Sequence, residues 1–220
     1  MKQEIRNLSE PVEFRAKGDK IVAGGYAAKF RTLSQNLGGF VETIEPGTFA
    51  KTIQEADVRA LFNHDPNMLL GRNKSGTLRM EEDGTGLAYE IDLPDTTVGR
   101  DVATLLERGD ISGSSFGFRT IEDEWGETES GFPLRTLKSV ALRDVSPVVY
   151  PAYVDTDSAI RSLAESRSLD LEELRAAADK NELQALLSER SEAESEDDEQ
   201  DEDDDRAQPI VVRRKFAHLL

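Results

Sequence analysis

The sequence predicts an α+β protein: a mostly antiparallel β-barrel core with a few helices packed outside it, then a C-terminal helix and a disordered acidic tail. Between residues 11 and 158, most segments are short and rich in β-branched and aromatic residues, as strands are. Only two helical patterns interrupt them. Many short strands with few helices favour a closed or nearly closed barrel. After residue 155 the composition becomes charged and helical.

This change in composition divides the 220 residues into four parts. We expect an N-terminal arm (1–10), a folded domain (11–160), an amphipathic helical segment (161–190) and an acidic tail with a short basic and apolar end (191–220). Residues 189–205 carry twelve carboxylates and one arginine. Such a run repels itself and buries no apolar surface, so it is expected to be disordered.

The strands of the domain are predicted from alternation and turn signals. Residues 86–93 alternate apolar and polar side chains, as a half-buried strand does. The sequence Asp-Gly-Thr-Gly at 83–86 is a hairpin signal. Further strands are expected at residues 20–30, 58–62, 77–80, 116–121 and 134–149.

Two helices are predicted within the domain. Residues 46–53 begin with Pro46, which suits a first helical turn. Residues 101–108 place their apolar side chains on one face and are followed by Gly109, which suits a C-cap.

A third helix, of roughly 20 residues, is predicted after residue 168. Asp170 and Glu173 have the spacing of a capping box. The helix carries a narrow apolar stripe of Leu171, Leu174, Ala178, Leu183, Leu186 and Leu187. This stripe either docks on the helix's own domain or pairs with a partner helix through a coiled-coil-like seam, and the sequence leaves both open.

The composition restricts the chemistry of any active site. The chain has no cysteine, which excludes a thiol protease and a Cys-ligated zinc site, and we expect no cofactor and no metal. It has no long apolar run and no signal-peptide core, so a membrane is not an expected partner. A net charge of −17 argues against nucleic acid as a partner. These features suggest a soluble, cytosolic protein.

Few residues of this chain could act as the nucleophile and the general base of a hydrolase. The chain has two histidines, of which His218 is three residues from the end, so His64 is the candidate base. Residues 113–117 (Gly-Ser-Ser-Phe-Gly) match the G-x-S-x-G nucleophile elbow, but that elbow needs a strand before the serine and a helix after it. Here the helix precedes and the strand follows, so the α/β-hydrolase interpretation fails.

A triad in the order His64, Ser115, acid is still available. An imidazole must take the proton of the serine hydroxyl and needs a partner on its other nitrogen. Asp144 is the candidate, because it is a lone acid in an apolar strand pattern, where an unpaired carboxylate is costly. The structural alternative is that Asp144 pairs with Arg143 or Arg135.

At these residues the chain resembles the prohead (capsid maturation) proteases of tailed bacteriophages, whose fold is similar to that of the herpesvirus assembly proteases. Four blocks within residues 10–158 carry the resemblance: 60–65 (Ala-Leu-Phe-Asn-His-Asp) with Leu-Gly-Arg at 70–72; 99–109 leading into Asp-Ile-Ser-Gly at 110–113; 114–118 (Ser-Ser-Phe-Gly-Phe); and 142–146 (Leu-Arg-Asp-Val-Ser) with Val-Tyr-Pro-Ala-Tyr at 149–153.

The resemblance implies a role for each candidate residue. His64 is the base and Ser115 the nucleophile, with Ser114 as an adjacent competitor. Alternating strand geometry points the two serines to opposite faces, so only one can meet His64. The herpesvirus enzymes use a second histidine as third member, and here an acid such as Asp144 takes its place. The oxyanion donors are expected among backbone amides near the serine or around residues 143–146.

The function implied is an endopeptidase inside the assembling procapsid, in the host cytoplasm. It cleaves a scaffold, or the scaffold-like N-terminal arm of the major capsid protein, and then itself; whether it forms a homo-oligomer stays open. Two alternatives compete. One is a non-catalytic assembly or scaffolding protein. The other is a hydrolase or acyltransferase acting on small molecules.

Overall fold

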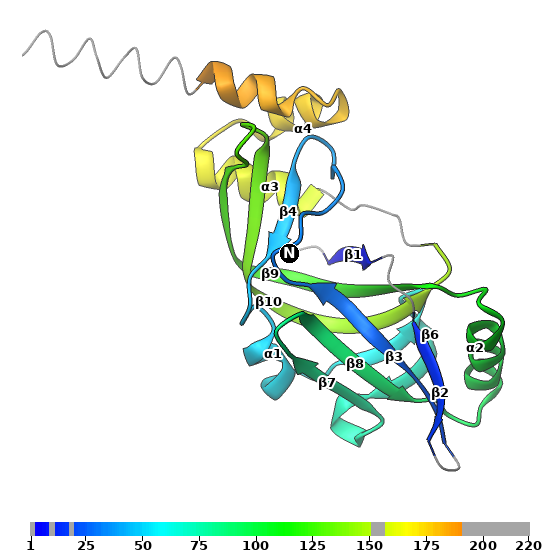
Figure 1. Cartoon of the computed structure of the whole chain (residues 1–220). Coiled ribbons are helices and arrows are strands. Elements are labelled where there is room, and N and C mark those ends of the chain that lie inside the picture. Colours follow the sequence, from blue (N-terminus) through cyan, green and yellow to red (C-terminus); the bar gives the residue numbers. More distant parts are fainter. Residues whose placement is uncertain (1–2, 9–11, 18–19, 151–156, 191–220) are drawn as a thin grey trace, which may run out of the picture.

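The strands form two sheets in a computed structural model that describes residues 3–8, 12–17, 20–150 and 157–190 (Figure 1). The first sheet has the order β1-β9-β10-β5-β6, with β4 also paired to β10. Its strands are β1 (Glu4–Leu8), β4 (Val41–Ile44), β5 (Arg59–Phe62), β6 (Asp65–Arg72), β9 (Gly113–Glu127) and β10 (Pro133–Val148). The second has the order β2-β3-β8-β7, all antiparallel. Its strands are β2 (Glu13–Lys17), β3 (Lys20–Lys29), β7 (Leu78–Glu82) and β8 (Gly86–Asp92).

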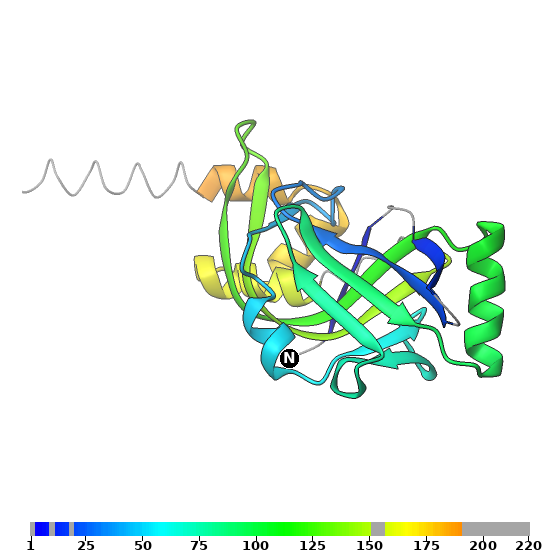
Figure 2. The same ribbon diagram turned by 60° about the horizontal axis from the view of Figure 1, so that its bottom comes forward.

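The two longest strands, β9 and β10, organise the first sheet. They pair antiparallel along nearly their whole length, while β4 and β5 both run parallel to β10. The far end of this hairpin projects away from the second sheet toward α3 (Asp157–Arg167), as both ribbon views show (Figures 1 and 2). This long hairpin therefore contributes to two regions: it forms the centre of the first sheet, and its far end lies against the C-terminal helices.

The main core lies between the sheets. It is built from the inward-facing apolar side chains that alternation predicts, and α2 (Thr97–Arg108) packs against it at one side (Figure 1). Its largest wholly buried members are Phe49, Tyr89, Phe116, Phe118, Leu70, Leu87, Ile91 and Leu137.

The C-terminal helices form a second core with the tip of the β9–β10 hairpin. They are α3, α4 (Leu171–Asp179) and a further helical stretch at 183–190. Leu37 and Phe40 lie in this core, and Trp125 of β9 packs on it, donating its indole N–H to Ser162 of α3 (3.2 Å). The predicted apolar stripe thus docks on its own chain, because all six of its residues belong to this core or pack against it.

The expected helices are partly corrected. The first, α1 (Ala50–Glu55), begins four residues later than predicted, because residues 46–49 form a turn. The second, α2, ends where predicted, with Gly109 as its C-cap at φ 78°, but it begins four residues earlier than predicted, at Thr97. The predicted C-terminal helix of about 20 residues is wrong as one element. Asp170 does cap α4 by accepting from the Glu173 N–H, but the helix ends before Asn181, whose φ is 61°.

The α+β class is confirmed, but the barrel is not. Backbone pairing within the described ranges gives two separate sheets rather than one closed ring of strands. The expected arm contains a strand, β1, and the acidic tail (191–220) lies outside the described residues. The four-part division stays a prediction.

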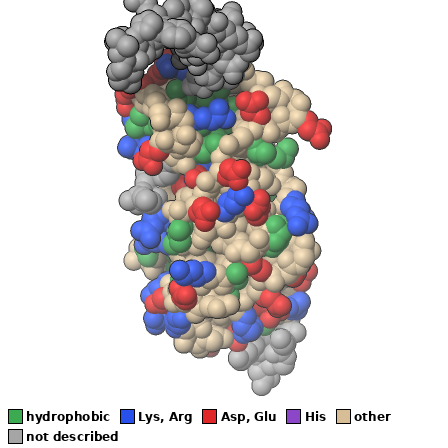
Figure 3. All heavy atoms as spheres, turned by 90° about the vertical axis from the view of Figure 1, so that its left-hand side faces the viewer, with side chains coloured by type: hydrophobic (Ala, Val, Ile, Leu, Met, Phe, Trp, Pro, Cys, Tyr) green, Lys and Arg blue, Asp and Glu red, His purple; other side chains and the backbone are tan. Residues whose placement is uncertain are grey.

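The described surface is mixed in charge. Figure 3 shows acidic and basic side chains interspersed over one face, whereas twelve carboxylates stand together in the sequence at 189–205. None of the helices in the described residues is long and apolar enough to span a membrane.

Candidate active site

His64 lies in the two-residue turn that joins β5 to β6. Asn63 and His64 both have positive φ, 52° and 59°, as a type I′ hairpin requires, and Asn and His are among the non-glycine residues that tolerate this region best. The Asn63 N–H donates to the Pro147 carbonyl (3.1 Å), and the Asn63 side-chain oxygen accepts from the Val149 N–H (3.0 Å). Two bonds to the end of β10 therefore fix the turn that carries the imidazole.

Asp144 owes its orientation to a β-bulge in β10. Leu142 lies opposite Phe118, and Asp144 lies opposite the next residue of β9, Gly117. Arg143 is thus the extra residue, and a bulge of this kind reverses the alternation of side chains that follow it. Without the bulge, Asp144 would share the core face of Leu142. With it, the carboxylate lies on the opposite face, together with Ser115.

Ser115 and Ser114 point to opposite faces of β9, as alternation predicts. Ser115 is paired with Ser146 of β10 and its side chain faces His64. The Ser114 hydroxyl instead hydrogen-bonds the Tyr89 hydroxyl in the core (2.8 Å). Burial raises the pKa of Tyr89 to about 12 although the bond to Ser114 lowers it, so the phenol stays neutral. Geometry therefore brings Ser115, and not Ser114, to the imidazole.

The three predicted side chains form one hydrogen-bonded chain. His64 Nε2 lies 2.6 Å from Ser115 Oγ, and His64 Nδ1 lies 2.5 Å from Asp144 Oδ1. The two ring nitrogens thus face a hydroxyl on one side and a carboxylate on the other. Asp144 forms no ion pair with either candidate arginine in the described chain, because Arg135 pairs with other carboxylates and Arg143 is exposed.

Two residues that the sequence did not suggest hold the carboxylate. The Ser146 hydroxyl donates to Asp144 Oδ1 (2.9 Å), and the Gln3 side-chain N–H donates to Asp144 Oδ2 (3.2 Å). Ser146 follows Asp144 by two residues on the same strand, a spacing that sequence reading could have used. Nothing in the local sequence marks Gln3, because it lies 141 residues from Asp144 in the chain.

The site is closed on one side and hollowed on the other. Ser115 is 0% exposed and Asp144 is 4% exposed, while the His64 side chain keeps 13% of its surface. A hollow beside the imidazole is lined by both polar and apolar side chains, among them Gln3, Arg59, Leu61, Pro66, Leu69 and Arg143. The hollow therefore opens onto His64 and Asp144 but not onto the buried Ser115.

A hydroxyl, an imidazole and a carboxylate in series are the arrangement of serine hydrolases. The chain belongs to the family of caudovirus prohead serine proteases, whose family model matches residues 10–169. It is thus a phage prohead protease of the serine peptidase class, which acts in capsid maturation in the assembling procapsid. Capsid or scaffold proteins are the substrates that this role implies.

No curated protein matches the chain. Among solved structures it is similar to the bacteriophage T4 capsid assembly protease, gp21, with a TM-score of 0.49 and 14% identity, over 68% of this chain and 98% of that one.

Proposed function

We propose that the protein is an endopeptidase that uses Ser115 as nucleophile, His64 as general base and Asp144 as the group that orients the imidazole. The observation that supports this most is the continuous chain from Ser115 Oγ through both ring nitrogens to the carboxylate, at 2.6 and 2.5 Å.

The steps follow from these contacts. Ser115 Oγ attacks the carbonyl carbon of the scissile bond while His64 Nε2 takes the hydroxyl proton, and the tetrahedral intermediate then collapses as His64 returns the proton to the leaving amine. Water repeats the sequence to release the acyl group. Asp144 accepts from Nδ1–H, which fixes the tautomer and stabilises the imidazolium. The amide of Arg143, the extra residue of the bulge, is the oxyanion donor we favour.

The substrates proposed are a scaffold or the scaffold-like N-terminal arm of the major capsid protein, and later the enzyme's own chain. Twelve carboxylates at 189–205 and the basic end beyond them suggest a segment for packaging or scaffold contact that self-cleavage removes. A chain ending at Arg190 keeps the docked helices and tests this directly. If it enters procapsids as well as the full chain, the tail is not the packaging element.

Covalent labelling separates this proposal from its alternatives. A fluorophosphonate should label the full chain at Ser115, located by peptide mass, and His64→Ala should suppress the labelling. Turnover of activated esters with no cleavage of capsid or scaffold protein would favour the small-molecule hydrolase. No labelling and no cleavage would favour a non-catalytic assembly protein.

A further inference from the structure

The N-terminal strand β1 lies along the free edge of β9, directly beside the nucleophile. The pairing is antiparallel and places Asn7 opposite Ser115, with Arg6 opposite Phe116 and Leu8 opposite Ser114. β1 pairs with no other strand in the described chain and precedes the residues that the family model matches, 10–169. An extended peptide added to a sheet edge is a common mode of peptide recognition.

β1 competes for the proton of the nucleophile. Ser115 Oγ lies 2.9 Å from the Arg6 carbonyl oxygen, to which it can donate, and 2.6 Å from His64 Nε2. A serine hydroxyl has one proton, so donation to Arg6 removes the bond that general-base catalysis needs. Together with the complete burial of Ser115, this contact makes the docked strand incompatible with attack on another peptide.

The residue that precedes β1 also contacts the acid of the site. Gln3 donates to Asp144 Oδ2 (3.2 Å) across a position with no side chain, Gly117. A Cβ at residue 117 would lie 2.4 Å from that carboxylate oxygen and 2.5 Å from the Gln3 amide nitrogen. The backbone here leaves room for an extended strand to reach the carboxylate.

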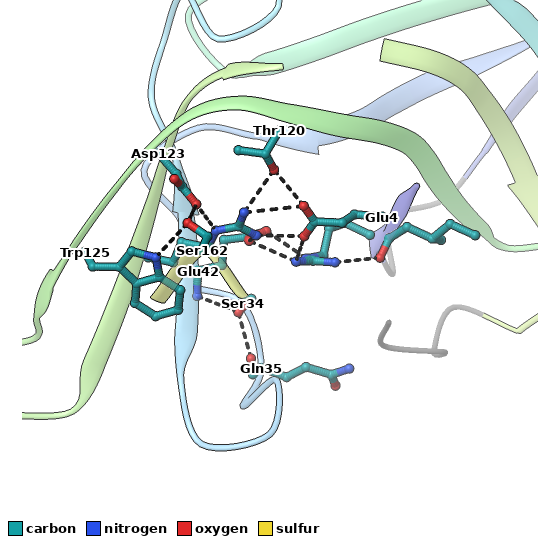
Figure 4. Close-up of polar contacts among 11 residues, drawn as sticks. Glu4, Ser34, Gln35, Glu42, Thr120, Asp123, Trp125 and Ser162 are labelled. Atoms are coloured by element: carbon teal, nitrogen blue, oxygen red, sulfur yellow. Dashed lines mark hydrogen bonds and ion pairs between the residues drawn. The ribbon is translucent and has the colours of Figure 1, made fainter. Parts of the chain in front are cut away.

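On its other face, β1 inserts two charged side chains into a buried polar cluster (Figure 4). Glu4 accepts from Arg135 (2.7 Å) and from Thr120 (2.6 Å). Arg6 donates through Nε and Nη2 to the two carboxylate oxygens of Glu42 (2.8 and 3.0 Å).

The buried polar cluster also contains ion pairs in which β1 takes no part. Arg135 is 0% exposed and also contacts Glu42 (3.0 Å) and Asp123 (2.6 Å). Charge-assisted hydrogen bonds are roughly twice as strong as neutral ones, and a charge left unpaired away from water is costly. The cluster therefore provides one place for an acidic and one for a basic side chain, two residues apart on an extended strand.

From these contacts we propose that the edge of β9 is the peptide-binding surface of the active site, and that β1 is its resident occupant. An incoming peptide takes the register of β1, with an acidic side chain on Arg135 and a basic one on Glu42. The enzyme's own strand must leave first. This rests on the catalytic roles proposed above, but the binding surface itself does not need them.

The test measures binding in trans. A fluorescent peptide of residues 1–9 is titrated by anisotropy into the full wild-type chain and into Glu4→Ala/Arg6→Ala, which keeps the net charge and leaves Arg135 paired with Glu42 and Asp123. The control is Asp95→Ala/Arg100→Ala, which removes an exposed ion pair at the start of α2. In wild type and control, the tethered strand competes at high effective concentration.

We expect the peptide to bind Glu4→Ala/Arg6→Ala about ten-fold or more tightly than it binds wild type or the control, since one charged hydrogen bond is typically worth about a factor of ten. A peptide with alanine at both charged positions should bind weakly. Equal affinities for all three proteins, or affinity independent of the peptide's charges, would overturn the proposal. If the double variant does not fold, Arg6→Ala alone, which leaves Glu4 and Glu42 on Arg135, gives the same comparison.

Fluorophosphonate labelling separates this proposal from the catalytic one. Bound peptide should slow the labelling of Ser115 in the double variant. If the peptide binds selectively and Ser115 is never labelled, the binding surface stands and the catalytic roles fail. If Ser115 is labelled equally fast in wild type and the double variant, β1 does not cover the nucleophile and the proposal is wrong.

Discussion

Asp144 and Gly117 are cross-strand neighbours, and the carboxylate of Asp144 occupies the space where a side chain at 117 would stand. The bulge at Arg143 and the missing Cβ at 117 act together: one turns the carboxylate onto the face of Ser115, and the other gives it room.

Gly117→Ala should therefore damage the site. The new methyl group would lie within 2.4 Å of Asp144 Oδ2, so the carboxylate must move, and a displacement near 1 Å costs on the order of 10²-fold in rate. We expect kcat/KM on a capsid or scaffold substrate to fall by that factor. Gly126→Ala is the matched control, because it lies on the same strand with nothing within 4 Å of its added Cβ. Similar activities for the two variants would contradict the assignment of Asp144.

Asp144→Asn should abolish most activity. An amide cannot stabilise the imidazolium and favours the wrong tautomer, so kcat should fall by roughly 10²- to 10⁴-fold. Ser146→Ala, which removes one donor to the carboxylate (2.9 Å), should cost much less. Arg143→Ala separates the alternatives for Asp144. Full activity of Arg143→Ala fits a carboxylate bound to His64, whereas a loss equal to that of Asp144→Asn would favour the arginine pair.

The two adjacent serines should have opposite phenotypes. Ser114→Ala leaves the buried Tyr89 hydroxyl without its partner (2.8 Å), which should cost about 1–3 kcal/mol of unfolding free energy with little loss of activity. Ser115→Ala should abolish activity at nearly unchanged stability. Denaturant unfolding and peptide cleavage measure both. Adding Tyr89→Phe to Ser114→Ala should recover part of the stability, because both polar groups are then absent.

The stability contributed by Glu4 should depend on pH. Burial alone raises the pKa of its carboxyl, but hydrogen bonds and the charges of Arg135 and Arg6 outweigh burial and hold the pKa below its ordinary 4.5. A carboxyl with a lowered pKa stabilises the folded chain above the ordinary value, and that stability is lost as the pH falls through the folded-state pKa. Glu4→Gln should thus cost roughly 1–3 kcal/mol near pH 7 and less near pH 3.

Urea unfolding at the two pH values measures that difference. The control is Glu13→Gln, whose exposed carboxylate on β2 pairs with the exposed Arg15 (3.3 Å). A difference between wild type and Glu4→Gln that stays constant with pH would contradict the account of the buried cluster.

The candidate site residues could be chosen from the scarcity of suitable side chains and from the family resemblance, but their geometry could not be predicted. Apart from His218 near the chain end, His64 is the one histidine, and the chain has no cysteine, so the base is His64 and the nucleophile is a hydroxyl. Asp144 is a lone acid in an apolar strand pattern, and the family resemblance indicates Ser115. Strict alternation, however, places Asp144 on the core face with Leu142, and only the bulge at Arg143 reverses it. No local pattern marks that bulge.

Contacts between segments that are far apart in the sequence could not be predicted from local patterns either. The turn at Asn63 and His64 lacks the glycine that usually marks such a hairpin. β1 was predicted only as part of an arm, because the strand it pairs with, β9, lies more than 100 residues further along the chain. The break in the C-terminal helix could have been predicted from the sequence. Apolar residues on one helix face are three or four residues apart, whereas Ala178 and Leu183 are five apart.

The most direct test of the account is the intact mass of the purified protein, incubated over time with capsid or scaffold protein, for wild type, Ser115→Ala and His64→Ala. We predict that wild type cleaves its substrate and trims itself, while both variants leave every chain whole. Cleavage by Ser115→Ala at the wild-type rate would contradict the central claim that this serine, positioned by His64 and Asp144, is the nucleophile.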